Sequence, residues 1–241
     1  VNVSILSKNI FLIGKRSEEL SKVLANEFIS KGNKKIIIAY NSNDDFMPSI
    51  AFALKEKLES ANIEVIYLNY VSLGEKEINQ HTALAEAINP DAYVFLGYTE
   101  TGLLMKKYRQ VGLKGTFYAI NTVAQKTAEG ALEGSRILQF TPQDGIRSLS
   151  ENFVDKYRRK YQSEITQPWI AFQAYDAINI LLHAIKGLDD QEISVSTLRE
   201  QLLYTRDFEG VSGVITIDPN GSSHGIAWSL YNFENGKFIK K

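Results

Sequence analysis

Cysteine is absent from the 241 residues, which excludes disulfide bonds, thiolate nucleophiles and cysteine-ligated metal sites. Charge of one sign is not in excess either, because 27 Lys and Arg residues accompany 28 Asp and Glu residues, for a formal net charge of -1. That balance gives no basic surface for nucleic acid or an anionic membrane, so we expect neither as a partner. No apolar run approaches the length of a membrane span.

Motifs that carry catalysis are also missing. The sequence has no glycine-rich phosphate loop, no dinucleotide-binding Gly-x-Gly-x-x-Gly and no nucleophile elbow around Gly210-Val211-Ser212-Gly213. Its three histidines, His81, His183 and His224, are scattered and form no metal-binding pair. Asp44-Asp45 is more typical of a solvated loop or helix cap than of a catalytic carboxylate pair. We therefore expect no catalytic residues, metal or cofactor, and a protein that is not an enzyme.

Apolar runs of strand type alternate with helical patterns in the first part of the chain. Ile36-Ile37-Ile38 is typical of a buried parallel strand, and Asn89-Pro90 and Gly112 are helix stop signals. We expect strands at residues 34–40, 63–68, 92–96 and 116–119, and helices at 49–60, 75–88 and 102–111. Short connections between alternating elements indicate an α/β fold with a parallel sheet.

The pattern changes after a further strand at 136–140. Helices are expected at 146–161, 168–186 and 196–204, and the middle one starts at Pro168, which suits a first helical turn. Strands are expected at 214–217, 226–233 and 238–239, with a turn at 218–221 and a hairpin at Asn235-Gly236. The helix 168–186 has a broad apolar surface that needs a sheet to cover it.

Loops that follow the parallel strands are the candidate binding site, since ligands bind beyond the carboxyl ends of strands in open parallel sheets. These loops are residues 41–48, 97–101 and 120–125. The candidate ligand-binding residues are Ser42, Asn43, Phe46, Phe95, Tyr98 and Asn121. Two other interpretations stay open: the Asn and Ser side chains serve as turn formers and helix caps, and Phe46 and Phe95 belong to the core.

Three motifs in order point to a known family. They are Phe153-Val154-Asp155-Lys156-Tyr157, Tyr175-Asp176-Ala177 inside the helix 168–186, and the segment from Gly210 to Gly221. Asp91-Ala92 opening a strand and Gly112-Leu113-Lys114 closing a helix fit the same pattern. Together they resemble the C-terminal two-thirds of a type I periplasmic solute-binding protein, of the branched-chain amino-acid binding kind that serves ABC importers.

The resemblance implies a complete α/β lobe at residues 13–140 with 226–241, and a partial, mostly helical second lobe at 1–12 with 141–225. It implies an extracytoplasmic receptor that binds a small molecule, such as an amino acid or organic acid, between two lobes. An ABC permease is the implied partner. A ligand-sensing domain of the same fold in a signalling protein is the alternative, and an enzyme comes third.

The family's members begin with about one lobe that this sequence does not contain. It opens on Val1 and shows no signal peptide, so we interpret it as a fragment. We expect a second copy, an exchanged element or a separate N-terminal segment to cover the apolar face of the helix 168–186.

Three departures from the family's pattern bear on the ligand. Phe46 stands where the family has Tyr, Phe95 falls near a second aromatic with Leu96 replacing a small residue, and Asn121 stands where an acid pairs with the ligand's ammonium. An amide cannot neutralise an ammonium in a desolvated site. We therefore expect leucine, isoleucine and valine to bind weakly or not at all.

Overall fold

The structure is a computed structural model that describes residues 7–14, 16–122, 130–141, 144–189 and 192–240. These residues form two compact units. Unit 1 lies within Arg16–Gln139 and Trp228–Lys241, and unit 2 lies within Asn2–Lys15 and Phe140–Ala227. Residues 123–125 of the third expected loop lie outside the described residues.

Unit 1 contains a seven-stranded sheet in the order β10-β9-β5-β4-β3-β1-β2. Its strands are β1 (Lys35–Asn41), β2 (Glu64–Tyr70), β3 (Ala92–Leu96), β4 (Thr116–Ile120), β5 (Arg136–Phe140), β9 (Trp228–Glu234) and β10 (Lys237–Lys240). Strands β1 to β5 pair in parallel, and β9 and β10 form an antiparallel hairpin through Asn235 and Gly236, which both have positive φ. The expected α/β fold with a parallel sheet is thus confirmed.

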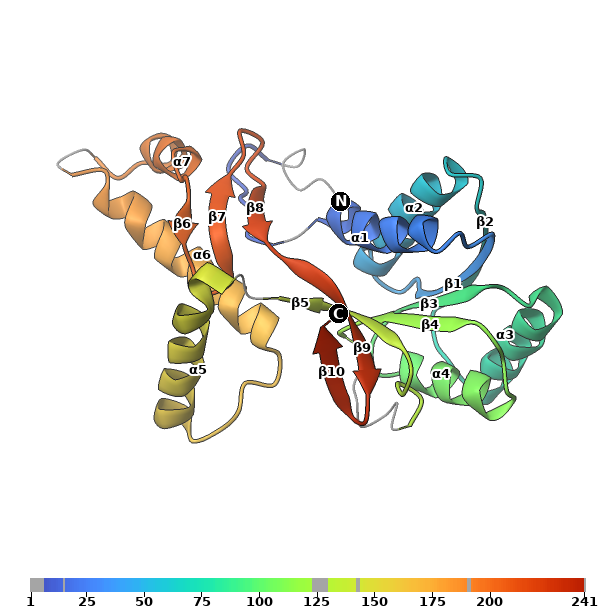
Figure 1. Cartoon of the computed structure of the whole chain (residues 1–241). Coiled ribbons are helices and arrows are strands. Elements are labelled where there is room, and N and C mark those ends of the chain that lie inside the picture. The colour runs from blue at the N-terminus through green and yellow to red at the C-terminus, as the bar shows by residue number, and fades with distance from the viewer. Residues whose placement is uncertain (1–6, 15, 123–129, 142–143, 190–191, 241) are drawn as a thin grey trace. The chain divides into compact units, whose positions relative to one another are not determined.

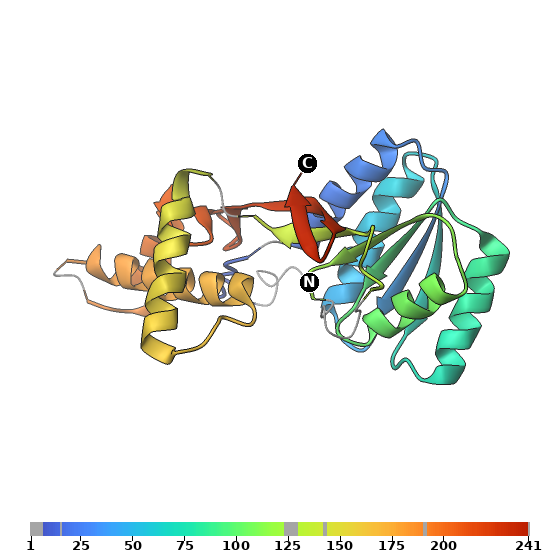
Figure 2. The same cartoon turned by 60° about the horizontal axis from the view of Figure 1, so that its bottom comes forward.

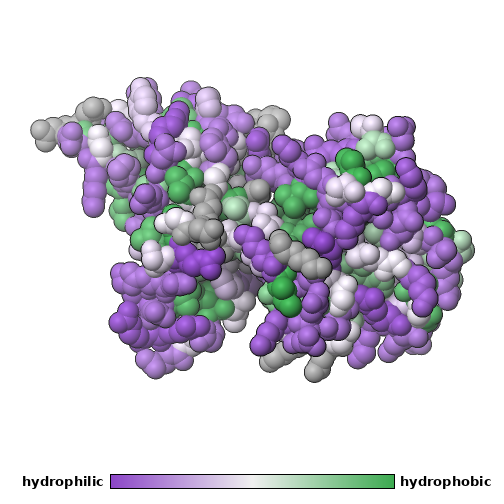
Figure 3. All heavy atoms as spheres, viewed as in Figure 1, coloured by the Kyte–Doolittle hydropathy of each residue, from purple (hydrophilic) through white to green (hydrophobic). Residues whose placement is uncertain are grey.

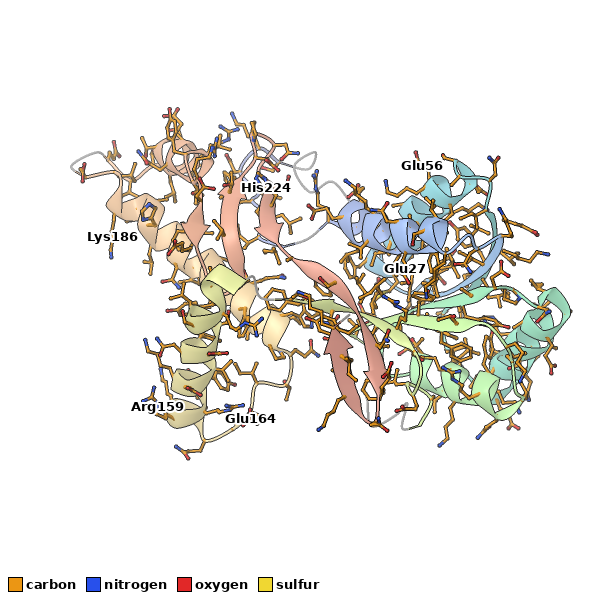
Figure 4. The ribbon with its side chains drawn as sticks, in the orientation of Figure 1. Glu27, Glu56, Arg159, Glu164, Lys186 and His224 are labelled. Carbon is orange, nitrogen blue, oxygen red and sulfur yellow. The ribbon has the colours of Figure 1, made fainter. Side chains whose placement is uncertain are left out.

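Two pairs of helices cover the sheet of unit 1. Helices α1 (Ser17–Ser30) and α2 (Phe46–Glu59) lie on one face, and α3 (Glu75–Ile88) and α4 (Thr101–Gln110) lie on the other (Figures 1 and 2). Helix α1 was not expected from the sequence, although its buried residues Leu20, Leu24 and Phe28 have helical spacing. The labelled Glu27 on α1 ties this helix to the sheet, because its Oε1 lies 3.1 Å from Arg136 Nη1 (Figure 4).

The core between the sheet and α3–α4 is rich in aromatic rings. Tyr93 and Phe95 of β3, Phe117 of β4 and Tyr108 of α4 are all at most 1% exposed. Their ring centroids lie 5.2 to 6.3 Å apart, and most of the pairs pack edge to face or tilted. Aromatic pairs of this kind contribute about 0.5–1.5 kcal/mol each beyond their buried area.

Unit 2 combines three helices with a small antiparallel sheet. The helices are α5 (Arg147–Tyr161), which follows the short 3-10 helix Asp144–Ile146, α6 (Pro168–Lys186) and α7 (Val195–Leu203). The sheet has the order β6-β7-β8, with β6 (Phe208–Glu209), β7 (Gly213–Ile217) and β8 (Ser223–Ile226). The strand expected at 226–233 corresponds to β9 of unit 1, except that Ile226 is the last residue of β8, which was not expected and belongs to the other sheet.

A buried carboxylate joins α6 to the loop before β7. Asp176 is 1% exposed, and its Oδ1 accepts from Val211 N at 2.8 Å while its Oδ2 accepts from Ser212 N at 2.7 Å. The Ser212 hydroxyl donates to the same Oδ2, and the Ser150 hydroxyl of α5 donates to Val211 O at 2.8 Å. The Tyr175-Asp176-Ala177 and Gly210–Gly221 motifs thus meet through these bonds.

The described part of the chain lacks two features. It contains no helix with the length and apolar character that a bilayer crossing requires. Within the same residues, no three His, Cys, Asp or Glu side chains gather in a way that suits a metal ion.

Candidate functional site

The carboxyl ends of β1, β2 and β3 lie side by side in unit 1. Asn41, the last residue of β1, pairs with Tyr70, the last residue of β2, and Tyr40 pairs with Leu96 at the end of β3. Because the strands are parallel, the loops that follow them emerge at one edge of the sheet. Tyr70 is 4% exposed and Asn41 is 8% exposed, so the polar groups at this edge are largely buried.

Glu100 connects the loops at this edge. Its Oε1 accepts from Asn41 Nδ2 at 2.8 Å and from Tyr98 N at 3.2 Å, and it lies 3.5 Å from the Tyr70 hydroxyl. The Tyr70 hydroxyl lies 2.9 Å from Thr101 Oγ1. We call Asn41, Tyr70, Tyr98, Glu100 and Thr101 the strand-end cluster. It brings together one carboxylate, one amide, hydroxyl groups and two aromatic rings.

The two tyrosines of the cluster are hydrogen-bonding groups in their neutral form. Burial raises the pKa of Tyr70 well above its ordinary value. Burial and the Asp44 carboxylate raise the pKa of Tyr98 to about 12. Both hydroxyls therefore keep their protons at neutral pH and present polar, uncharged groups beside the Glu100 carboxylate.

Residues that follow β1 form further hydrogen bonds to members of the cluster. Ser42 donates through its N and its Oγ to Tyr70 O, at 2.7 and 3.0 Å, and Asn43 N donates to Asn41 Oδ1 at 2.7 Å. Asp44 Oδ1 accepts from the backbone N of Phe46 and Met47, so Asp44 caps the start of α2. The interpretation of Asp44 as a helix cap is borne out by these bonds.

Four of the six candidate residues lie in the strand-end loops, and Phe46 is the first residue of α2, directly after the first of these loops. Ser42, Asn43 and Phe46 follow β1, Tyr98 follows β3 and Asn121 follows β4. Phe46 is 37% exposed and Tyr98 is 40% exposed, so both rings are available at the surface. Asn121 N donates to Leu138 O, and the hydroxyl of the next residue, Thr122, donates to Gly97 O, which joins the loops after β3 and β4.

Phe95 requires a correction. Its side chain is fully buried in the aromatic core against Tyr93, Tyr108 and Phe117. It therefore supports the sheet from inside and does not reach the strand-end loops. The second of the two interpretations of Phe95, a core residue, is the one that the structure supports.

Four members of the cluster were not among the candidate residues: Asn41, Tyr70, Glu100 and Thr101. One local signal was available, the glycine at position 97. A Cβ atom there would overlap Thr101 Oγ1 and the Tyr70 hydroxyl and would come within 3.2 Å of Glu100 Oε1. Only a residue without a side chain lets these groups close over the backbone.

Gly97→Ala is therefore expected to disturb the cluster. Overpacking of a well-packed site costs about 1–3 kcal/mol, and the Tyr70–Thr101 hydrogen bond has to break for the methyl group to fit. Chemical unfolding would measure the loss of stability. Gly145→Ala is the matched control, since a Cβ atom there meets nothing within 4 Å. Equal stability of the two variants would contradict the packing argument.

A separate cavity of about 600 Å³ lies within unit 2. It is a groove between α5 and α6, bounded at one end by residues 208–211, and aromatic and lysine side chains line it. No candidate residue from the sequence analysis lines it. Its chemistry differs from that of the strand-end cluster.

Comparison with known proteins gives a consistent family. A family model described as "Periplasmic binding protein" matches residues 4–235. A leucine-, isoleucine-, valine-, threonine- and alanine-binding protein of Pseudomonas aeruginosa is 23% identical over 223 residues. A Leu/Ile/Val-binding protein of Citrobacter freundii is 24% identical over 216 residues. Each alignment covers 87% of this chain and 56% of the relative, so the chain spans about half the length of these relatives.

Solved structures share the fold. A leucine-binding protein from Thermotoga maritima superposes with a TM-score of 0.84 at 22% identity, over 99% of this chain and 69% of that one. A substrate-binding protein of an ABC transporter from Desulfitobacterium hafniense, solved in complex with Leu, gives a TM-score of 0.69 at 21% identity, over 92% and 64%. With the family model matched along nearly the whole sequence, the chain belongs to the periplasmic binding protein family, in its type I, branched-chain amino-acid-binding-like group.

Proposed function

We propose that this chain binds a small organic solute at the strand-end cluster of unit 1 and does not convert it. The observation that carries the proposal is the convergence of Asn41, Tyr70, Tyr98 and Glu100 at the carboxyl edge of a parallel sheet. A few polar groups beside aromatic rings, at this edge, are typical of small-molecule sites. Family membership supports binding over catalysis.

The proposed setting is extracytoplasmic, as the receptor of an ABC importer. Its support is the names of the relatives, which bind leucine, isoleucine and valine, and the name of a solved neighbour that is an ABC transporter component. The ligand we propose is an amino acid or a related organic acid.

Tyr98→Ala tests the site without disturbing the core. The ring is 40% exposed, so its removal should leave the unliganded protein as stable as before while weakening solute binding. A thermal-shift panel of amino acids and small carboxylates measures this, since a ligand at 100 times its Kd stabilises the protein by about 2.7 kcal/mol. Tyr204→Ala, at a 74% exposed ring in unit 2, is the control. No shift with any solute, or equal shifts in both variants, would contradict the proposal.

Position 121 is expected to set the response to leucine. Glu100 Oε1 already accepts hydrogen bonds from Asn41 and Tyr98, so this oxygen organises the loops and does not replace an acid at position 121. Asn121→Asp should therefore increase the melting shift that leucine produces, while wild type responds weakly. Asn62→Asp, at an exposed position between α2 and β2, controls for added negative charge. A clear wild-type shift with leucine would show that an amide at 121 is no obstacle.

A further inference from the structure

A histidine occupies an inward position on helix α3. Ile78, His81, Ala85 and Ile88 recur at helical spacing, and the two isoleucines and Ala85 pack against the aromatic core of unit 1. The outer side of the helix meets solvent, and Figure 3 shows mainly purple, hydrophilic atoms over this part of unit 1. The spacing therefore puts a titratable ring at a position where the helical period calls for an apolar side chain.

The His81 ring packs against Tyr70, a member of the strand-end cluster. The two ring centroids lie 6.2 Å apart at an interplanar angle of 62°, which is an edge-to-face arrangement. The Tyr70 ring is 4% exposed, and its hydroxyl lies 2.9 Å from Thr101 Oγ1 and 3.5 Å from Glu100 Oε1. His81 thus supports the tyrosine whose hydroxyl group belongs to the cluster.

One nitrogen of the His81 ring is enclosed without a partner. Nδ1 is buried and has no hydrogen bond to any described residue, while the backbone of His81 is fixed because the Tyr108 hydroxyl donates to His81 O at 3.2 Å. In the neutral ring Nδ1 can be the nitrogen without a proton, whereas both ring nitrogens carry a proton in the charged ring. A proton on Nδ1 would therefore lack an acceptor unless the ring turned, and turning would end its contact with Tyr70.

The titratable groups beside His81 come from three elements. In the described part of the chain they are Glu77, one turn earlier on α3, Tyr70 of β2 and Tyr108 of α4. Burial lowers the pKa of His81 below its ordinary value, and the Glu77 carboxylate opposes this with a smaller effect. Burial raises the pKa of both tyrosines, so both stay neutral. The neutral His81 ring is therefore the form that the fold favours, and this preference begins to cost stability as the pH falls below about 6.5, the ordinary pKa of histidine.

We propose that His81 is a positioning residue of the strand-end cluster: its neutral ring holds the Tyr70 hydroxyl beside Glu100 and Thr101, and protonation of His81 releases this hydroxyl. The arrangement is a property of the unliganded chain. Its consequence for binding rests on the proposed solute site, where the loss of one hydrogen-bonding group weakens affinity by about tenfold. Solute is thus held at neutral pH and released as the surroundings become acidic.

Nuclear magnetic resonance of the unliganded protein tests the coupling of the two rings. At pH 7.5 we expect a nuclear Overhauser contact between the Tyr70 ring and the Thr101 methyl group, which fades toward pH 5 with the same midpoint as the His81 ring resonances. In His81→Phe, whose ring fills the space without titrating, the contact should persist at both pH values. His183→Phe, at an exposed histidine of α6, is the matched control and should behave as wild type. A wild-type contact that survives protonation of His81, or a His81 ring that takes up no proton above pH 5, would overturn the proposal.

Solute binding supplies the second test. Any amino acid or small carboxylate that stabilises the wild type at pH 7.5, and has no pKa of its own between 5 and 8, should bind about tenfold more weakly at pH 5.5 by titration calorimetry. His81→Phe should bind it equally at both pH values, an outcome that a merely structural role of the ring does not predict. Equal wild-type affinity at both pH values would contradict the proposal. A panel in which no solute binds would contradict the solute site instead, and the resonance experiment would still decide the role of His81.

Discussion

Asp176→Ala is expected to lower the free energy of unfolding of unit 2 by about 3 kcal/mol or more, the largest effect we predict in this unit. Three donors, Val211 N, Ser212 N and Ser212 Oγ, would lose their acceptor in an environment where the carboxylate is 1% exposed. Each buried donor left unsatisfied costs about 1–3 kcal/mol.

Two measurements separate this effect from a general loss of charge. Urea unfolding gives the stability, and hydrogen exchange should show faster exchange at the amides of Val211 and Ser212. Asp176→Asn keeps one acceptor oxygen and should lose less. Asp155→Ala, at an exposed acid on α5, should change stability by no more than about 0.5 kcal/mol. Unchanged exchange at 211 and 212 in Asp176→Ala would refute the assigned role.

The second large effect is expected in unit 1, where Phe95→Ala should cost about 3–5 kcal/mol of stability through the cavity it leaves. The ring is 0% exposed and contacts three other rings, so the site cannot collapse without moving α4. Tyr98→Ala, three residues later, serves as the comparison and should be nearly neutral. If Phe95→Ala instead kept wild-type stability and lost only solute binding, the ring would belong to the ligand site after all.

Phe95 also shows why the candidate site could be predicted only in part. The strand-end loops follow from the alternation of strands and helices, which is strong in this sequence. The direction of each side chain near a strand end does not follow from the sequence. A parallel strand that is covered on both faces is apolar throughout, so it shows no alternation of polar and apolar residues. Strand β3 is buried at all five positions, so Phe95 looks the same in sequence whether it faces the core or a ligand.

The predicted bounds agree best with the structure for a long helix that carries a clear start signal. Helix α6 has the expected bounds, with Pro168 at its start. Helix α1 was missed because charged residues separate its apolar positions, and packing on α2, distant in sequence, supports it. The strand expected at 226–233 agrees with β9 except at its start, because Ile226 still pairs with Gly213 of β7 as the last residue of β8, and β9 then joins the other sheet.

The order of strands in unit 1 has a consequence for biosynthesis. Strand β9 lies next to β5 in the sheet, with β10 beyond it, yet all of the described unit 2 after β5 is translated before these two strands. Until residue 228 leaves the ribosome, β5 is an unpaired edge whose backbone groups can template pairing with other chains. The nascent protein therefore depends on protection of that edge, and expression of any version that stops before Trp228 favours aggregates.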